Sequence, residues 1–460
     1  MKIIQHEKYD INIEPSDWRF SAAIIGLGKY LKYHDFEFDD GYTDEIFKFK
    51  RKDIEEEKYL EFVENYYGDK MSHTRVQNIL LEDSISEEQF KLVNSLLNGA
   101  NTSNAVMKKV FKGIKATEEN KNMILEMIQQ NRNVLIKETF RHKKNMYANY
   151  ANTGLLFGEK RSVCRLNGYY VDGNRKGKAI SYNFDTNTFV GEDDMVFDFI
   201  PFAFYGDREA FFVNDNYSLK GLKSTNTVLE RCIIERVEKS DSENIDVRRI
   251  LFETIRNLAE EFIDYDVEVI VKNRERDFFE TLYIRKESIE ILKSIENYNS
   301  FCFSYPVNEK YYINVQEHVT NCILNLIRTD DLIELFLRIK EHNYSFLVRS
   351  LIGINMKICG GEEEMNKSMK GAYACAKEVV AKIPQNKIES YRTKLISSIV
   401  FKDYDRALQI LLQLSNYSDV QFNFAYDLFE DFEDNKDIAY TFINALRSDK
   451  VNNKKEEVNS

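Results

Sequence analysis

The chain has 460 residues and a formal net charge of −12 at pH 7, with 43% hydrophobic and 30% charged residues. This length suffices for two or three domains of roughly 100–200 residues each, with a large buried core. The 4 prolines are too few for a Pro-rich linker, and no run reaches the roughly 18 apolar residues of a membrane span. Residues 1–10 are charged and unlike a signal peptide, so we expect a cytoplasmic protein with no membrane partner.

A helix over residues 18–33 is the clearest element of the N-terminal region. Ser16 or Asp17 can cap it, because a short side-chain oxygen accepts hydrogen bonds from the free N–H groups of the first turn. Apolar residues recur within it at helical spacing. Gly26 and Gly28 also lie inside it, and we expect them to permit close approach of another backbone.

The elements that follow change from helical to strand periodicity along the chain. Residues 86–150 are mostly helical, whereas after Arg161 the apolar residues alternate and turn-formers separate successive runs. Helices are expected at 54–67, 246–262 and 286–297. Strands are expected at 2–13, 46–50, 163–172, 178–184, 196–204, 210–214, 267–271, 279–284 and 310–315.

Beyond Glu317 the pattern is helical throughout, which predicts a bundle of four antiparallel helices over residues 319–339, 365–381, 387–414 and 420–446. The predicted fold class is therefore α+β. We expect a mixed α/β body over residues 1–316, a helical bundle over 317–449, and a frayed tail over 450–460. Within the body we expect a helical basic segment at about 86–150 and a β-rich core at about 160–215.

The six cysteines lie far apart, and none forms a C-x-x-C pair. This spacing argues against a zinc ribbon and against a disulfide framework. We expect ordinary thiols in a reducing compartment, and neither a metal nor a cofactor. The cysteines are Cys164, Cys232, Cys302, Cys322, Cys359 and Cys375.

Basic residues are concentrated in the middle of this acidic chain. Residues 101–180 hold 16 Lys and Arg against 6 Asp and Glu, a balance of +10 that leaves −22 for the remainder. Such a segment favours a localised anion-binding surface. The alternative is a solvated helix face on which basic residues cluster by chance, and charge alone leaves both open.

Two clusters carry the anion-binding hypothesis. Lysines of the first recur at helical spacing, so that one helix face would present several ammonium groups to a phosphate track. The second joins phosphate-binding side chains to asparagines, which can read base edges. Tyr147 and Tyr150 lie between those asparagines and can stack on unpaired bases. The clusters are Lys108, Lys109, Lys112 and Lys115, and then Arg141, Lys143, Lys144, Asn145, Asn149 and Asn152.

A third basic group, with Arg175, Lys176 and Lys178, lies between two predicted strands. Its two glycines superficially suggest a P-loop, but the glycine spacing and the Ser or Thr after the lysine are missing. We expect a hairpin tip that either touches a phosphate backbone or is simply solvated.

Catalytic motifs are scarce. His34-Asp35 is an HD dipeptide, but a metal-dependent nuclease needs several further ligands, and the six histidines are scattered. A histidine at the end of a helix is the simpler interpretation. There is no G-x-S-x-G elbow and no H-E-x-x-H pair, so we expect a protein that is not an enzyme.

The run from Ile13 to Leu27, with its Ser16-Asp17-Trp18 step and apolar, Gly-containing helix, resembles the opening of a known family. That family is the large subunit of type I CRISPR interference complexes (Cascade). Further matching stretches are Asn152-Thr153-Gly154, residues 164–172, residues 198–204 and residues 212–216. The resemblance covers roughly the first half of the chain, and the second half agrees in layout. Some relatives carry paired C-x-x-C ligands in the middle region. This chain has none, so the resemblance places it in a cysteine-poor subgroup.

The resemblance implies a non-catalytic subunit of a ribonucleoprotein in antiviral defence. Such a subunit holds the 5′ end of the guide RNA and recognises the protospacer-adjacent motif in duplex DNA. It also helps to unwind that duplex and recruits a separate helicase-nuclease. Base pairing then reads the remaining target. The implied partners are the CRISPR guide RNA, target duplex DNA, the other Cascade subunits and the helicase-nuclease.

Two other functions remain open at this point. One is a helical scaffold with no nucleic-acid role, whose associations would respond weakly to salt. The other is a metal-dependent nuclease built around His34 and Asp35.

Overall fold

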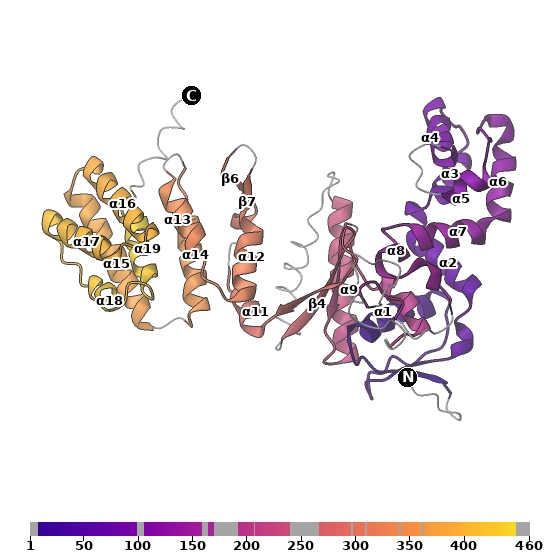
Figure 1. Cartoon of the computed structure of the whole chain (residues 1–460), viewed down its shortest axis with the longest axis horizontal. Helices are drawn as coiled ribbons and strands as arrows, with labels where there is room; N and C mark the ends of the chain where they lie inside the picture. Colours follow the sequence, from indigo (N-terminus) through magenta and orange to yellow (C-terminus); the bar gives the residue numbers. More distant parts are fainter. Residues whose placement is uncertain are drawn as a thin grey trace, which may run out of the picture. The chain divides into compact units, whose positions relative to one another are not determined.

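The computed structural model describes residues 8–98, 105–158, 164–169, 192–206, 208–239, 266–295, 298–308, 311–339, 342–360 and 363–447. Contacts divide the chain into two compact units, Met1–Ile284 and Arg285–Ser460. The described residues are mainly helical with small antiparallel sheets, so the predicted α+β class is confirmed (Figure 1).

Helix α1 (Trp18–Tyr33) runs through the main core of the first unit and has the predicted bounds. Asp17 caps it, since its carboxylate accepts from the backbone N–H of Arg19 at 2.7 Å. Most residues of α1 are buried, because the helix is covered by the 3-10 helix η6 (Met195–Phe202) and by other elements of the unit.

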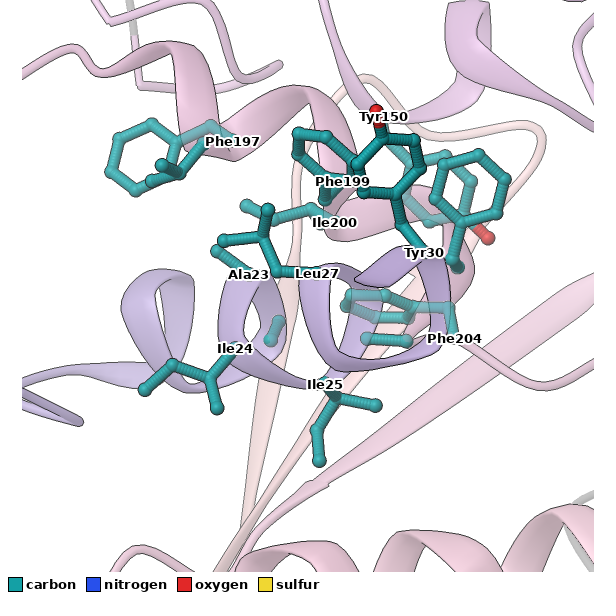
Figure 2. Close-up of a cluster of buried hydrophobic side chains, with 14 of the residues drawn as sticks. Ala23, Ile24, Ile25, Leu27, Tyr30, Tyr150, Phe197, Phe199, Ile200 and Phe204 are labelled. Atoms are coloured by element: carbon teal, nitrogen blue, oxygen red, sulfur yellow. The ribbon is translucent and has the colours of Figure 1, made fainter. Parts of the chain in front are cut away.

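One glycine sets how closely α1 approaches η6. A Cβ atom added to Gly26 would lie 2.0 Å from the carbonyl oxygen of Phe199, whereas one added to Gly28 would meet nothing within 4 Å. The predicted backbone approach is therefore confirmed at Gly26 and wrong at Gly28. Figure 2 shows the result, with Leu27 of α1 lying close to Ile200 of η6.

The expected strand at residues 196–204 is wrong, because these residues form most of η6. Pro201 lies within the segment and has no N–H to donate to a strand ladder. The carboxylate of Asp194 caps the 3-10 helix by accepting from the N–H of Val196 at 3.1 Å. Since all side chains from Val196 to Phe202 are buried, the apolar run reflects burial on every side and not a strand.

The β-rich core is accordingly smaller than expected. From the predicted strand at 163–172 the structure describes residues 164–169, and there Leu166 makes an isolated bridge to Ala151. The predicted strand at 178–184 and the predicted helix at 246–262 lie outside the described residues.

A three-stranded antiparallel sheet confirms three other predicted strands. Its order is β3 (Glu209–Asn214), β4 (Val267–Asn273) and β5 (Glu280–Ile284). Helix α9 (Leu219–Lys239) packs on β3. There the Asn226 amide accepts from the N–H of Val213 at 3.2 Å and donates to its carbonyl at 2.8 Å. One side chain thus satisfies two backbone groups at the edge of the sheet.

A buried ionic network joins η6 to the segment before it. Arg165 is fully buried; its Nε lies 2.9 Å from Asp193, and one terminal nitrogen lies 2.7 Å from Asp198. The hydroxyl of Tyr147 donates to the same Asp198 at 2.6 Å. Each charge is paired and further hydrogen-bonded, which is what burial of charges requires.

A second, smaller core of the first unit lies among helices, and the described part of residues 86–150 is mostly helical as predicted. The helices around this core are α3 to α7, which gather beyond α2 (Figure 1). The remaining elements of this unit are β1 (Ile11–Ile13), β2 (Phe47–Phe49), α2 (Glu56–Tyr67), α3 (Ser72–Leu80), α4 (Glu87–Asn98), α5 (Ala105–Val110), α6 (Lys121–Gln130), α7 (Arg132–His142) and α8 (Tyr147–Tyr150).

The second unit is helical, but its described part has more breaks than a bundle of four helices. The predicted helix at 387–414 is interrupted at Lys402, which has a φ of +56°, and at Asp403, whose carboxylate caps the next helix. The elements are α11 (Lys286–Lys293), β6 (Ser304–Pro306), β7 (Tyr312–Asn314), α12 (Val315–Asn325), α13 (Asp330–Arg338), α14 (Ser345–Ile358), α15 (Glu363–Lys382), α16 (Gln385–Val400), α17 (Tyr404–Ser418), α18 (Ala425–Glu430) and α19 (Lys436–Ala445).

Candidate nucleic-acid interface

The first lysine cluster does not occupy one helix face as the sequence predicted. Helix α5 ends at Val110, and Gly113 adopts a φ of +78°, a left-handed conformation that stops helical repetition. Lys108 and Lys109 therefore belong to the last turn of α5. The two later lysines of the cluster, Lys112 and Lys115, lie exposed in the connection that follows.

The second cluster begins at the end of α7. Glu138 lies 3.4 Å from Arg141 and 3.4 Å from His142, so this carboxylate offsets part of the positive charge of the last turn. The Lys143 ammonium donates to the carbonyl of Lys70 at 2.6 Å. Lys144 is exposed to solvent.

A pocket of about 1150 Å³ joins the two clusters, and we call it the basic pocket. Helix α5, helix α7, residues 143–145 and Arg274, which directly follows β4, form its walls. It gathers four residues that the sequence predicted separately and adds Arg274, which sequence reasoning missed. Its lining is Ala105, Val106, Lys109, Val110, Asn131, Val134, Glu138, Thr139, His142, Lys143, Lys144, Asn145 and Arg274.

The basic pocket carries an excess of positive charge. Among the described residues that line it, four are permanent cations and one, Glu138, is a carboxylate. The buried Lys272 lies close by, where loss of water and, more weakly, the charge of Lys144 lower the pKa of its ammonium to about 8, against the attraction of Asp277. A concave wall with one sign of charge concentrates the field and attracts anions. Phosphate groups fit this arrangement.

The asparagines of the second cluster are separated by the fold. Asn145 lines the basic pocket, whereas Asn149 is buried and its amide oxygen accepts from Lys272 at 3.2 Å. Asn152 is exposed and caps a short turn through a 3.1 Å bond from the N–H of Gly154. In this conformation Asn145 is the one of the three that faces the pocket.

The two tyrosines between these asparagines are core residues. Tyr147 and Tyr150 are both buried, so neither presents a ring for stacking on a base, which corrects that part of the prediction. The two tyrosines alternate with the asparagines in the sequence, but in α8 both rings are buried in the main core.

A second pocket with lysines, of about 360 Å³, lies between α1 and α9. Its charges are partly matched, because Lys29 lies 2.7 Å from Glu230 and Lys223 forms an ion pair with Asp40. The exposed Lys32 and Lys220 complete its basic residues. Two of its four lysines therefore have carboxylate partners.

Comparison with known proteins assigns the chain to a family. The sequence profile of CRISPR-associated protein Csx8 (Cas_Csx8) matches residues 9–244 and 226–446. The chain belongs to this family. No curated protein and no solved structure matches it. Membership makes it a CRISPR-associated protein, in line with the resemblance to the Cascade large subunit.

Membership in the CRISPR-associated Csx8 family implies a role in CRISPR defence and interaction with other CRISPR components. The basic pocket lies wholly within the first matched region, apart from Arg274 in the second. Among the described residues no helix is both long and apolar enough to cross a membrane. Arg175, Lys176 and Lys178 of the predicted hairpin lie outside the described residues.

His34 has a structural environment. Its Nε2 bonds the carbonyl oxygen of Lys58 at 2.8 Å, and its ring packs on Tyr30 and Phe36 at centroid distances of 4.9 and 5.5 Å. It also occupies the C-cap of α1, as the helix-end interpretation predicted. In the part of the chain that the structure describes, no three His, Cys, Asp or Glu side chains converge as metal ligands do.

Proposed function

We propose that this member of the Csx8 family is the non-catalytic large subunit of a type I Cascade complex, and that its basic pocket contacts a nucleic-acid backbone. In this role the chain binds the 5′ end of the guide RNA, recognises the protospacer-adjacent motif in duplex DNA, helps to unwind the duplex and recruits the helicase-nuclease.

The observation that carries the proposal is the convergence of Lys109, Lys143, Lys144 and Arg274 on one pocket in a CRISPR-associated chain. These residues come from three segments separated by up to 165 positions in sequence. Clustering by chance along one helix does not explain that arrangement, since the fold has to bring the segments together. A nucleic-acid partner would present phosphates to these cations at high density.

The identity of the complex is tested by purifying the tagged chain from its native cells and sequencing the RNA that accompanies it. We expect short RNAs with a uniform 5′ end and repeat-derived sequence. A chain that returns alone and without RNA would refute the large-subunit proposal and favour the helical scaffold.

The site is tested on the purified complex with a charge-reversal pair, Lys109→Glu with Lys144→Glu. Both side chains are exposed, so the fold should tolerate the change. We expect affinity for duplex DNA to fall at least about tenfold near 0.1 M salt. The negative slope of log affinity against log salt should become shallower by about 1.5 to 2, because two phosphate contacts are lost.

The matched control is Lys52→Glu with Lys91→Glu, which reverses two exposed charges of the same unit outside the basic pocket. Equal losses in the two pairs would mean that net charge alone matters, and the basic pocket would then not be the contact. A normal RNA content with unchanged DNA binding in both pairs would mean that the complex is intact and that the DNA contact lies outside the basic pocket.

A further inference from the structure

Arg392 of α16 is a buried cation whose one ion pair among the described residues, with Glu389, is long. Its side chain is 3% exposed, and the carboxylate of Glu389 lies 3.8 Å away, beyond hydrogen-bond distance. One terminal nitrogen donates to the carbonyl of Leu337 at 2.6 Å, while the buried Nε has no hydrogen-bond partner in the described chain. Loss of water consequently lowers the pKa of the guanidinium, with Glu389 opposing this effect only in part and Arg447 adding to it.

This arrangement is unfavourable in the isolated chain. A buried charge is normally paired and fully hydrogen-bonded, because removing it from water costs several kcal/mol. The ion pair at 3.8 Å with the partly exposed carboxylate of Glu389 compensates little of that cost. The described residues therefore compensate this buried charge only in part, and its Nε is left without a hydrogen bond.

Arg392 lines a pocket of about 260 Å³ between α13 and α16, which we call the Arg392 pocket. Its lining, as far as the structure describes the chain, includes no carboxylate. Arg338 at its rim is exposed, and no ion pair links it to another described residue. Phe401 at the other end is 79% exposed. The lining is Leu337, Arg338, Arg392, Thr393, Ile396, Ser397, Val400 and Phe401.

The chemistry of the lining selects the occupant. Two guanidinium groups favour a carboxylate, to which arginine can donate two parallel hydrogen bonds. Ile396, Val400 and the exposed ring of Phe401 favour an apolar side chain beside that carboxylate. A phosphate backbone would satisfy the arginines but would leave this apolar surface uncovered. A protein segment fits both halves of the pocket.

We propose that the Arg392 pocket is a docking site for a partner protein, through a segment in which Asp or Glu adjoins a leucine-sized or aromatic side chain. The carboxylate pairs with Arg338 and with the charge of Arg392, and the apolar side chain packs against Phe401. This site lies in the second unit and is independent of the nucleic-acid role assigned to the basic pocket.

The test begins with a phage-displayed library of random 12-residue peptides selected on the immobilised full-length chain. Enriched peptides are then measured by fluorescence anisotropy, each beside a version with Gln and Asn in place of Glu and Asp. We expect enrichment of acidic residues next to Leu, Phe or Trp, and at least about tenfold weaker binding of the neutral versions, as loss of a charge-assisted pair implies.

The variants Arg338→Glu and Phe401→Ser probe the site without disturbing the buried Arg392. Both side chains are exposed, so folding should be preserved, which circular dichroism verifies. Each should weaken the enriched peptides at least about tenfold. The matched controls Arg406→Glu and Tyr426→Ser alter an exposed arginine and an exposed aromatic of the same unit outside the pocket, and should leave binding unchanged.

Four results would overturn the proposal. The first is a selection that enriches no acidic peptide. The second is peptide affinity that is unchanged in both Arg338→Glu and Phe401→Ser. The third is at least tenfold tighter peptide binding by a chain without residues 448–460, which would make the chain's own end the occupant. The fourth is a single-stranded 20-nucleotide DNA that binds in the same Arg338-dependent way, which would make the pocket a nucleic-acid site.

Discussion

Replacing Gly26 by alanine should destabilise the first unit, although alanine is the better helix former. The new Cβ would lie 2.0 Å from the carbonyl oxygen of Phe199, so α1 and η6 must separate by about 1 Å to reach a tolerable 3.0 Å. A displacement of η6 would strain the 2.6 Å bond from the Tyr59 hydroxyl of α2 to the Asp198 carbonyl. Overpacking of this kind costs about 1–3 kcal/mol or more, and the helix-propensity gain returns up to about 1 kcal/mol. We expect a net loss of about 2 kcal/mol.

The chain supplies its own control in Gly28→Ala. A Cβ there meets nothing within 4 Å, so only the propensity gain acts, and we expect up to about 1 kcal/mol of stabilisation. Trp18 is the one tryptophan of the sequence and is 6% exposed within the core that contains α1. Its fluorescence therefore reports urea unfolding of this unit. If the two variants shift the urea midpoint equally, or Gly26→Ala raises it, the close-approach argument is wrong.

Two further predictions concern buried charges. Arg165→Met leaves two buried carboxylates without their cation and should cost about 3–5 kcal/mol, seen as a lower urea midpoint of Trp18 fluorescence; an unchanged midpoint would contradict it. In the second unit, burial raises the pKa of Asp437 to about 6 against the weaker attraction of Arg328, so the folded chain binds this proton more tightly than the unfolded chain. Between pH 7 and pH 5 the native chain should therefore gain about 1 kcal/mol relative to Asp437→Asn in parallel urea titrations, and an identical pH dependence of the two would refute the pKa assignment.

Periodicity predicted the elements in which buried and exposed positions alternate regularly. Helix α1 was found to the residue, because Asp17 caps it and one apolar stripe continues to its end. The strand expected at residues 196–204 failed because η6 is buried on every side, and an unbroken apolar run carries no period to distinguish helix from strand. The break at Lys402 was also missed, since a left-handed residue other than glycine leaves no signal in composition.

The candidate site was predictable in its residues but not in its geometry. Lys109 and Lys144 were found because they lie in basic runs, and Arg274 was missed because cations and carboxylates alternate over residues 274–277 after β4. Asn149 looked the same in sequence as Asn145, yet one is buried against Lys272 and the other lines the pocket. Local spacing cannot separate these cases, because the difference arises from which segment packs against which.

The negative net charge of the chain affects how the basic pocket can bind DNA. At physiological salt the screening length is about 8 Å, so the pocket's cations act on an anion only at short range. A free duplex approaching the rest of the surface meets a net charge that is negative, which opposes non-specific binding. We therefore expect the isolated chain to bind DNA weakly. Strong binding should require an assembly that delivers the backbone to Lys109 and Lys144 directly, as a guide RNA held by neighbouring subunits would.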